Sequence, residues 1–386
     1  MKKRILYINT VCGFSSTGKI TADLARSDEY ESLVCYGRKK DFEGVNSYKF
    51  ANIVDNCFGA LRTILFDNNL NICGLATERL IRKIKEYNPD IIHLHNLHGY
   101  YLNVEMLFKF LKDYKKPVVW TLHDCWSITG YCPHFDMIDC NKYKNKCHNC
   151  PYDFSYPFSL FKQNVEKDYE KKKELFNSID NLTIVTPSKW LKEKVGESFI
   201  KNANTVVINN GIVLKDNDYK KNDKFTVIAV SSYWTKEKGK EELKEIIPLI
   251  NDDIEIVIVG DLKDNDQVFN RCKLIKRTTN YDELLNEYGK AHVLINPTLQ
   301  EVFGLVNVEA QSCGTPVITY KTGGSVETIN EDSGVIVEKG NYKELASAIN
   351  RLKNNYRFNK EKVIANSKKY NKEIMLNNYS ELYKKI

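Results

Sequence analysis

Residues 292–324 read HVLINPTLQEVFGLVNVEAQSCGTPVITYKTGG. Two apolar runs in this stretch, at 292–296 and 317–320, have the length of buried strands. Gly314, followed by Pro316, is typical of the end of a helix, which predicts a helix over 303–313. A strand, a helix and a second strand in this order indicate one unit of a parallel sheet.

The same alternation extends to both sides of this stretch. In the first half we expect strands at 4–9, 32–36, 91–94, 117–122, 182–185 and 205–208, and helices at 18–25, 77–87, 104–112 and 163–176. In the second half, further strands are expected at 225–230, 254–259, 273–275 and 334–337. Apolar strands separated by helices predict an α/β fold with two Rossmann-like, doubly wound domains. A ligand is then expected in a cleft between the domains, at the carboxyl ends of the strands.

The chain has 386 residues, which is long enough for two domains. The polar run at 215–224 is the best candidate for the linker between them. We therefore expect an N-terminal domain over 1–213, with a cysteine-rich insert at about 125–150, and a C-terminal domain over 214–360. Residues 361–386 are expected to be helical and to pack back on the N-terminal domain.

Composition narrows the class of protein. The formal net charge is +7, but no stripe of Lys and Arg is interleaved with aromatic residues, so nucleic acid is not an expected partner. No apolar run approaches the roughly 18 residues of a membrane-spanning helix. The basic residues 2–4 precede an apolar run too short for a signal peptide, so we expect a cytoplasmic protein. Lys-rich helices favour contact with anionic lipid at the inner face of the membrane, and a solvated surface is the alternative.

Two glutamates flank the start of the helix expected at 303–313. Its first N–H groups, on Phe303, Gly304 and Leu305, lack partners within the helix and form a backbone anion site. A nucleoside diphosphate fits such a site, and Gly304 would allow the phosphates a close approach. Glu301 and Glu309 would accept hydrogen bonds from hydroxyl groups of a sugar and a ribose. The alternative is that both are ordinary solvated or helix-capping residues.

A second glycine-rich turn, at 322–324, follows directly. The segment 296–324 resembles the E-x7-E signature of the retaining glycosyltransferases of family 4, which have the GT-B fold, and bacterial surface-polysaccharide glycosyltransferases in particular. Nearly the whole chain fits this resemblance. It implies transfer of a sugar, with retention, from a nucleotide-diphosphate (NDP) sugar to a glycan or lipid-linked saccharide in capsule, O-antigen or exopolysaccharide assembly. It also implies that no catalytic metal or other catalytic cofactor takes part.

The resemblance assigns roles to residues of the second half. Glu301 would hold the sugar as a catalytic residue, and Glu309 would hold the ribose. A Lys-Gly pair after the first strand of the second domain binds the diphosphate in the family, and Lys238 with Gly239 occupies that place. Many members carry an arginine at the end of that strand where Ser232 stands here, and Lys236 could supply a second cation.

The resemblance also assigns roles in the first half. Gly18, in a loop after the first strand, would let the backbone approach the donor phosphate. His123, at the end of the strand 117–122, would orient hydroxyl groups of the sugar as a second catalytic residue; the alternative is a histidine bonded within a turn. His95 and His98 follow the strand 91–94 and are acceptor-side candidates. With His93 they have a spacing that would suit a metal, but no carboxylate partner is evident.

Five of the eleven cysteines lie within the insert, and the other six are scattered small apolar groups. The last pair, Cys147 and Cys150, has the Cys-x2-Cys spacing of zinc ligands, and disulfides are uncommon in a reducing cytoplasm. We therefore expect a structural zinc ion held by Cys132, Cys140, Cys147 and Cys150. Disulfide bonds formed during purification are the alternative.

Two other functions stay open. A GT-B epimerase acting on a sugar nucleotide would need additional acid and base carboxylates, which the sequence does not place. A non-catalytic sugar-nucleotide-binding protein is favoured only by Ser232 in place of the arginine. A nicotinamide dehydrogenase would need a glycine fingerprint that is absent from the sequence.

Overall fold

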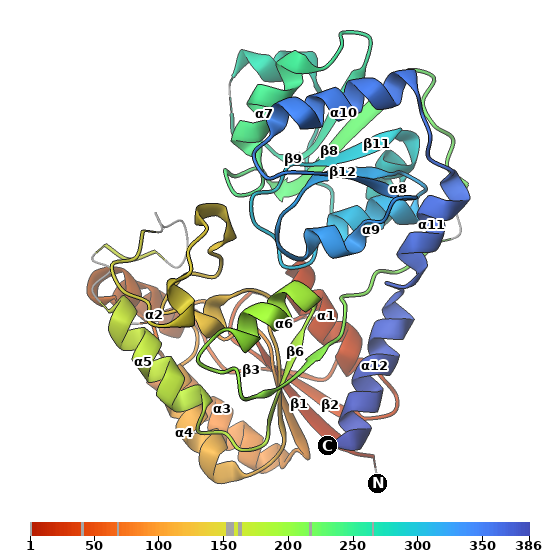
Figure 1. Cartoon of the computed structure of the whole chain (residues 1–386). Helices are drawn as coiled ribbons and strands as arrows, with labels where there is room; N and C mark the ends of the chain where they lie inside the picture. The colour runs from red at the N-terminus through yellow and green to blue at the C-terminus, as the bar shows by residue number, and fades with distance from the viewer. Residues whose placement is uncertain are drawn as a thin grey trace. The chain divides into compact units, whose positions relative to one another are not determined.

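The computed structural model describes residues 2–386 except 40–41, 68, 152–157, 161–163, 216–217 and 265. The chain forms two compact units (Figure 1). Unit 1 comprises Met1–Ile208 and Leu376–Ile386, and unit 2 comprises Asn209–Met375. Each unit is an α/β body with one parallel sheet, as the alternation of apolar runs predicts. The cleft expected between the two halves stays a prediction.

Unit 1 contains a seven-stranded parallel sheet in the order β3-β2-β1-β4-β5-β6-β7. The strands are β1 (Arg4–Asn9), β2 (Glu31–Tyr36), β3 (Ser47–Lys49), β4 (Ile91–Leu94), β5 (Val118–Thr121), β6 (Leu182–Thr186) and β7 (Asn204–Val207). The order reverses between β1 and β4, so the loops after these two strands diverge there. Doubly wound sheets bind ligands at such a point.

The helices of unit 1 are α1 (Ser15–Ala25), α2 (Ile53–Phe66), α3 (Gly74–Tyr87), α4 (Val104–Tyr114), α5 (Val165–Phe176) and α6 (Lys189–Gly196), with the 3-10 turns η1 (Trp126–Ile128), η2 (Asp136–Ile138) and η3 (Lys142–Lys144). The sequence analysis missed α2. Its N-terminus carries a capping box, in which Asn52 and Asp55 bond each other's backbone N–H groups. Apolar residues on its exposed face hide the polar-apolar periodicity that predicts a helix.

Unit 2 contains a six-stranded parallel sheet in the order β10-β9-β8-β11-β12-β13. The strands are β8 (Thr226–Tyr233), β9 (Glu255–Asp261), β10 (Lys273–Ile275), β11 (Val293–Asn296), β12 (Val317–Tyr320) and β13 (Gly334–Val337). The other elements are α7 (Lys240–Ile246), η4 (Ile247–Leu249), η5 (Gln267–Arg271), α8 (Tyr281–Lys290), α9 (Leu305–Ser312), η6 (Gly323–Thr328), α10 (Tyr342–Asn354) and α11 (Lys360–Lys368). The last helix, α12 (Lys372–Lys385), begins in unit 2 and continues into unit 1. The strand order reverses between β8 and β11.

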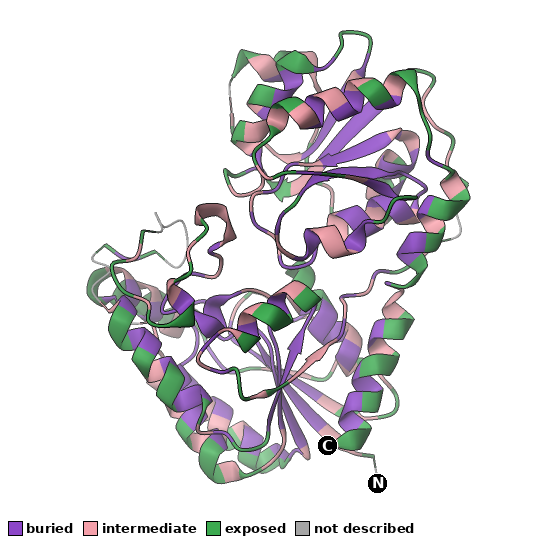
Figure 2. Cartoon of the chain, viewed as in Figure 1, coloured by how far each residue is buried: buried purple, intermediate pink, exposed green. Residues whose placement is uncertain are grey.

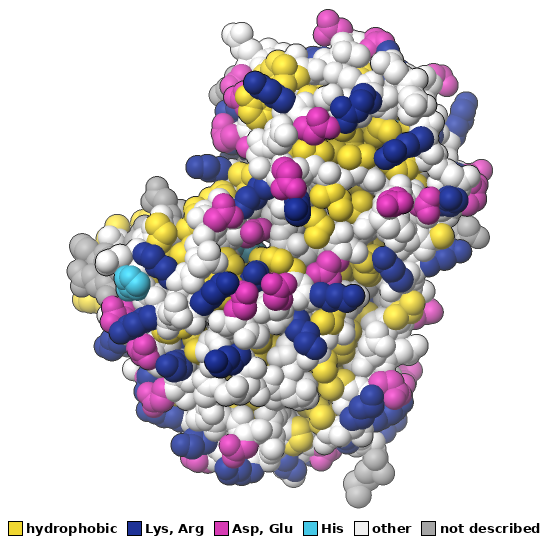
Figure 3. All heavy atoms as spheres, viewed as in Figure 1, with side chains coloured by type: hydrophobic (Ala, Val, Ile, Leu, Met, Phe, Trp, Pro, Cys, Tyr) yellow, Lys and Arg dark blue, Asp and Glu magenta, His cyan; other side chains and the backbone are white. Residues whose placement is uncertain are grey.

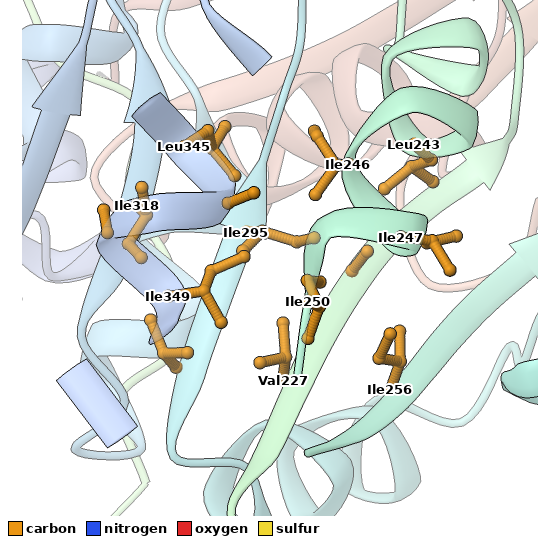
Figure 4. Packing of buried hydrophobic residues seen from close by; sticks show 14 of the residues in the cluster. Val227, Leu243, Ile246, Ile247, Ile250, Ile256, Ile295, Ile318, Leu345 and Ile349 are labelled. Carbon is orange, nitrogen blue, oxygen red and sulfur yellow. The ribbon is translucent and has the colours of Figure 1, made fainter. Parts of the chain in front are cut away.

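Apolar clusters cover both faces of the unit 2 sheet. On one face Val227 and Ile295 of the sheet pack with Ile246 of α7 and Ile349 of α10, all fully buried (Figure 4). A second cluster, which includes Leu294, joins the other face to α8 and α9. Figure 2 shows the buried strands between helices whose outer sides are exposed. Because burial of one such side chain contributes about 1.5–3 kcal/mol, these two layers fix the strand ends that carry the site.

The polar run expected as a linker lies inside unit 2. Lys221 extends its ammonium group to the carbonyl of Ala291, 2.6 Å away, and to the Thr315 hydroxyl, 2.7 Å away. The N–H of Asn222 donates to the carbonyl of Lys290. The units divide after Ile208, before the boundary at 213 that the charge run suggested. The polar composition suggested a linker, but the Lys221 ammonium bonds to groups within unit 2.

The C-terminal segment divides between the units. α11 contacts α9 within unit 2, where Asn366 donates to the Gln311 side chain at 2.6 Å. The part of α12 from residue 376 onward packs on unit 1, where the Tyr379 hydroxyl is 2.9 Å from that of Thr121 and Lys3 donates to the Tyr383 carbonyl. The return to the N-terminal domain therefore begins at 376 rather than at 361. Within the described residues, no helix has both the length and the apolar character needed to cross a bilayer.

Candidate active site

Lys238 and Glu301 lie together where the strand order of unit 2 reverses. Lys238 follows β8 and Glu301 follows β11, and these strands are neighbours in the sheet. The Nζ atom of Lys238 is 2.8 Å from Oε2 of Glu301. The other oxygen, Oε1, accepts a hydrogen bond from the Val302 N–H at 3.2 Å. Two of the residues predicted from the sequence are therefore joined in one ion pair.

Gly239 explains how the two loops approach each other. It has a φ of 83°, and a Cβ atom at this position would lie 2.3 Å from the carbonyl oxygen of Pro297. Only glycine tolerates both conditions. The N–H of Leu299 donates to the carbonyl of Glu237 at 2.9 Å, which joins the same loops through the backbone. These contacts hold Lys238 beside Glu301.

The turn before α9 differs from the prediction. The helix begins at Leu305, two residues later than expected, because Gly304 takes a left-handed conformation with φ 93° as the N-cap residue. Phe303 is buried, and its ring lies 5.3 Å from that of Tyr370. The side chains of Phe303 and Leu305 thus belong to the core, and only their backbone is suited to an anion. The first N–H groups of a helix and its dipole favour negative charge at this position.

A buried polar network positions this turn, and the sequence analysis missed it. Asn307 is fully buried; it donates to the hydroxyls of Ser325 (2.9 Å) and Thr328 (3.1 Å) and accepts from Asn296 (2.8 Å). The network ties the glycine-rich turn η6 to α9. The signal in the sequence was a polar residue on the buried side of a short helix.

The glycine-rich turn also bonds directly to Glu301. The N–H of Gly324 donates to the backbone carbonyl of Glu301 at 3.0 Å. The second glycine-rich turn that the sequence analysis found beside the glutamates is therefore their structural support.

Glu309 lies on the second turn of α9. Its Oε2 accepts a hydrogen bond from the buried Tyr288 hydroxyl on α8 at 3.2 Å. Burial, together with the Glu309 charge, raises the pKa of Tyr288 well above its ordinary value, so this hydroxyl stays a hydrogen-bond donor. A carboxylate can accept several hydrogen bonds at once, because each of its two oxygens has two lone pairs.

An arginine lies beside the strand end where the family pattern led us to expect one at Ser232. Arg277, which follows β10, donates to the Tyr233 hydroxyl at 2.8 Å, and its guanidinium is 5.1 Å from the centre of that ring. Its distance from β8 in the sequence kept it out of the prediction. Lys236 is exposed, and its role as a second cation stays a prediction.

The predicted histidines of unit 1 form two pairs after β4 and β5, which are neighbours in the sheet. Nδ1 of His95 is 2.9 Å from Nε2 of His123, and the rings are stacked with an interplanar angle of 12°. Nε2 of His98 is 2.7 Å from Oδ2 of Asp124. Asp124 is thus a carboxylate partner that the sequence analysis did not recognise.

His93 has a structural role. Its Nδ1 is 2.7 Å from the Tyr383 hydroxyl and its Nε2 is 2.8 Å from the Thr121 hydroxyl, so both nitrogens are occupied. The residue is fully buried and anchors α12 to the sheet.

Burial sets the charges of these groups. It lowers the pKa of His123 to about 4 and that of His95 well below its ordinary value. Burial alone would raise the pKa of Asp124, but the charge of His98 and its hydrogen bond lower it to about 2. At neutral pH the His95–His123 pair is therefore uncharged and suited to exchange hydrogen bonds with hydroxyl groups, while Asp124 is ionised.

Gly18 has a packing role in the first turn of α1. Its carbonyl accepts from the Gly13 N–H at 2.9 Å, and a Cβ atom would lie 2.9 Å from Cγ2 of Val11. The close approach of a phosphate to Gly18 stays a prediction.

We expect the neutral state of His123 to make unit 1 sensitive to acid. Because its folded pKa is about 4 and the ordinary value is about 6.5, the unfolded chain binds the proton first, and stability falls as the pH drops through this window. Asp124 does not titrate there, since its pKa is about 2. Urea unfolding should show wild type losing on the order of 2 kcal/mol relative to His123→Gln between about pH 7 and about pH 5. A constant difference would contradict the neutral assignment.

The cysteines of the insert are free thiols, as are the other cysteines of the described chain. In the part of the chain that the structure describes, no group of three or more His, Cys, Asp or Glu side chains has the arrangement of a metal site.

The charged groups of the surface are intermixed in sign on the face shown in Figure 3.

Two family models match consecutive parts of the chain. "Glycosyltransferase Family 4" matches residues 29–216, and "Glycosyl transferases group 1" matches residues 214–370. The chain is 25% identical over 290 residues to the putative colanic acid biosynthesis glycosyl transferase WcaC of Escherichia coli, covering 70% of this chain and 69% of that protein. It is 30% identical over 201 residues to the capsular polysaccharide biosynthesis glycosyltransferase CapM of Staphylococcus aureus, covering 44% of this chain and 52% of CapM.

Solved structures show the same fold. Sucrose-phosphate synthase from Thermosynechococcus elongatus matches with a TM-score of 0.71 at 16% identity, covering 100% of this chain and 99% of that one. Anabaena Alr3699/HepE, solved in complex with UDP, matches with a TM-score of 0.68 at 17% identity, covering 100% of both chains. With two Rossmann-like units and matches to both family models, the chain belongs to the family 4 glycosyltransferases of the GT-B fold.

Proposed function

We propose that the chain transfers a hexosyl group, with retention of configuration, from an NDP-sugar to a glycan or lipid-linked saccharide in surface-polysaccharide assembly. The observation that carries this proposal is the Lys238–Glu301 pair beside the left-handed Gly304 turn at the start of α9. The names of WcaC and CapM support a role in polysaccharide synthesis. The HepE structure in complex with UDP-glucose supports a nucleotide-sugar donor.

The diphosphate is assigned to the backbone before α9 and to Lys238. The N–H groups at the helix start and the Lys238 ammonium would stabilise the charge that develops on the leaving diphosphate. The side chain of Lys238 is 42% exposed, so its ammonium can reach a ligand while Glu301 orients it.

The two glutamates act as ligands in this proposal. Glu301 holds hydroxyl groups of the sugar, and Glu309, supported by Tyr288, holds the ribose. Because Lys238 and the Val302 N–H both contact Glu301, its carboxylate is held in one orientation, which suits a hydrogen-bond acceptor.

The histidines of unit 1 are assigned to hydroxyl groups. His123, neutral and stacked on His95, would orient hydroxyls of the sugar or the attacking oxygen, and His98 with Asp124 would contact the acceptor. The acceptor oxygen attacks the anomeric carbon from the side of the leaving group, the bond to the diphosphate breaks, and the diphosphate takes the proton. This scheme uses no nucleophile from the protein, and the match to transferase models favours it over an epimerase or a non-catalytic binding protein.

A panel of sugar nucleotides tests the proposal. A ligand that binds only the folded chain at about 100 times its Kd stabilises it by about 2.7 kcal/mol, which raises the melting temperature. We expect sugar nucleotides of one base to raise the melting temperature of the wild type in a concentration-dependent way. The rise should be smaller for Lys238→Ala. If no uridine, guanosine, thymidine or cytidine sugar nucleotide shifts the melting temperature, the proposal is wrong.

We also infer that the enzyme meets a lipid-linked acceptor at the inner face of the plasma membrane. The outward face of α2 supports this: Ile53, Phe58 and Phe66 are 77%, 64% and 67% exposed. Arg62 is the one basic residue of α2, and its one acidic residue, Asp55, is paired with Arg79. An apolar helix face with a single outward cation is suited to lie in the headgroup region of an anionic bilayer.

The α2 surface yields a direct test. Phe58→Glu is expected to reduce binding to vesicles of phosphatidylethanolamine and phosphatidylglycerol by about tenfold, because a buried aromatic ring is worth about 1.5–3 kcal/mol. Leu274→Glu, at a 54% exposed leucine of unit 2, is the matched control and should bind like wild type. Flotation of the full chain with vesicles measures both. Equal flotation of Phe58→Glu and wild type would exclude α2 as the contact.

A further inference from the structure

The insert at 125–150 has little regular structure of its own. Its elements are the turns η1, η2 and η3, each of three residues. A cavity lies among these turns, and four thiols are part of its lining: Cys132, Cys140, Cys147 and Cys150. Residues spread over 19 positions of an irregular segment therefore converge on one point.

Two of the thiols contact each other, and a third contacts the backbone. Cys132 and Cys150 are hydrogen-bonded side chain to side chain. The N–H of Gly130 donates to the sulfur of Cys147. A Cβ atom on Gly130 would lie 2.4 Å from the Val165 carbonyl oxygen and 3.0 Å from Cβ of Cys147, so only glycine allows this approach. The Gly130 backbone therefore fixes the position of the Cys147 sulfur at the cavity.

The Cys147–Cys150 turn is held in a fixed shape. Asn149 has a left-handed φ of 39°. The ammonium of Lys142 donates to the carbonyls of His148 (3.0 Å) and Asn149 (2.8 Å), which closes the turn over η3. A Cys-x2-Cys turn of this kind supplies two ligands to one zinc ion.

A buried lysine lies next to the cluster. Lys172 of α5 is fully buried; its ammonium donates to the carbonyls of Trp126 (2.8 Å) and Thr129 (3.0 Å) and lies 3.6 Å from the centre of the Trp126 ring. Burial lowers the pKa of Lys172 to about 7, and the negative charges of Asp168, Cys147 and Cys132 oppose that shift. Four thiolates around a divalent ion carry a net charge of about −2, and an adjacent ammonium offsets part of that charge.

We propose that Cys132, Cys140, Cys147 and Cys150 bind one zinc ion as a tetrahedral, purely structural site. As free thiols the four residues line the cavity without a ligating arrangement, and zinc would draw the sulfurs in to about 2.3 Å. Zinc binding would stabilise the fold of the insert, which has no apolar core of its own.

The insert adjoins the histidine pairs. The Cys125 N–H donates to the Pro133 carbonyl at 2.7 Å, and the Trp126 N–H donates to Oδ1 of Asp124 at 2.9 Å. A metal that fixes Cys132 thus fixes the segment that orients Asp124 toward His98. The zinc site does not depend on the proposed function, because its metal content is measured without a substrate.

The test is the metal content of the full chain, purified under reducing conditions without chelator. We expect about one zinc per chain by elemental mass spectrometry. Replacement by cobalt should give intense sulfur-to-cobalt charge-transfer bands and the visible bands of tetrahedral Co²⁺. A folded, metal-free wild type, or a cobalt spectrum without sulfur ligation, would overturn the proposal.

Matched variants localise the metal. Cys150→Ser should lose most of the zinc, while Cys57→Ser, at an exposed cysteine of α2 outside the insert, should keep it. Full zinc content in Cys150→Ser would overturn the ligand assignment. Disulfide bonds within the cluster would overturn the assignment as well. Each bond would lower the intact mass of protein freshly purified in reducing buffer by the mass of two hydrogen atoms. If Cys150→Ser does not fold, the cobalt spectrum of the wild type still shows whether sulfur ligands bind the metal.

Discussion

Glu301→Ala is expected to lower turnover at saturating sugar donor by about 100-fold or more, the usual cost of removing one oriented polar contact to a transition state. The substitution also frees Lys238, whose ammonium lies 2.8 Å from Oε2. Folding should change little, because partly exposed ion pairs contribute about 0–1 kcal/mol. A large kinetic effect with a small effect on stability separates a ligand of the sugar from a residue that only supports the fold.

Glu338→Ala is the matched control for this variant. Glu338 forms an ion pair of similar length, 3.0 Å, with Lys321 in the same unit, and both partners are exposed. Initial rates of nucleoside diphosphate release and urea unfolding would be measured for both variants. Turnover of Glu301→Ala equal to that of the control would remove Glu301 from the catalytic assignment.

Gly304→Val is expected to abolish detectable donor binding. Gly304 has a φ of 93°, which costs a β-branched residue at least about 1–2 kcal/mol, and a Cβ atom would lie 3.2 Å from Nδ2 of Asn307. The turn would have to shift away from Asn307 and Ser325, and the backbone N–H groups at the start of α9 would move with it. Isothermal titration calorimetry with the nucleotide identified in the donor panel measures the loss of affinity.

Gly340→Val is the control that separates the effect of backbone strain from the loss of the nucleotide site at Gly304. Gly340 has a similar φ of 79°, but no atom lies within 4 Å of a Cβ atom at this position. Gly340→Val should therefore show the cost of the backbone strain alone, and only Gly304→Val should lose the nucleotide. Equal affinity in the two variants would show that the Gly304 turn does not contact the diphosphate.

All strands except the three-residue edge strand β3 were predictable, because parallel strands buried on both faces are continuous apolar runs. β4, β10, β12 and β13 begin and end where the sequence analysis placed them. The end of α9 was predictable for a different local reason: Gly314 takes a left-handed conformation with φ 72° after the helix. The start of α9 was not predictable, because the turn before the helix is held through Asn307 and Glu301 by residues of η6 that are distant in the sequence.

The candidate site was predictable to the extent that it follows strand ends. Glu301 and Lys238 come after neighbouring strands of unit 2, and His95 and His123 come after neighbouring strands of unit 1. Strand adjacency brings each pair together, as expected for doubly wound sheets.

The residues that the sequence analysis missed act across long separations. Tyr288 reaches Glu309 from another helix, Arg277 reaches Tyr233 from another strand, and Asp124 reaches His98 from the next strand. No local pattern in one sequence reports such contacts. The helix α2 was missed for the opposite reason, because an apolar exposed face removes the periodicity on which helix prediction depends.

The central claim is that the segment from Glu301 to Glu309 holds a sugar nucleotide. The most direct test is the KM for the sugar donor in Glu309→Ala, compared with wild type at equal acceptor concentration. Loss of hydrogen bonds to a charged acceptor, worth about 1.5–3 kcal/mol, predicts a rise in KM of at least about tenfold. An unchanged KM for the donor would contradict the account.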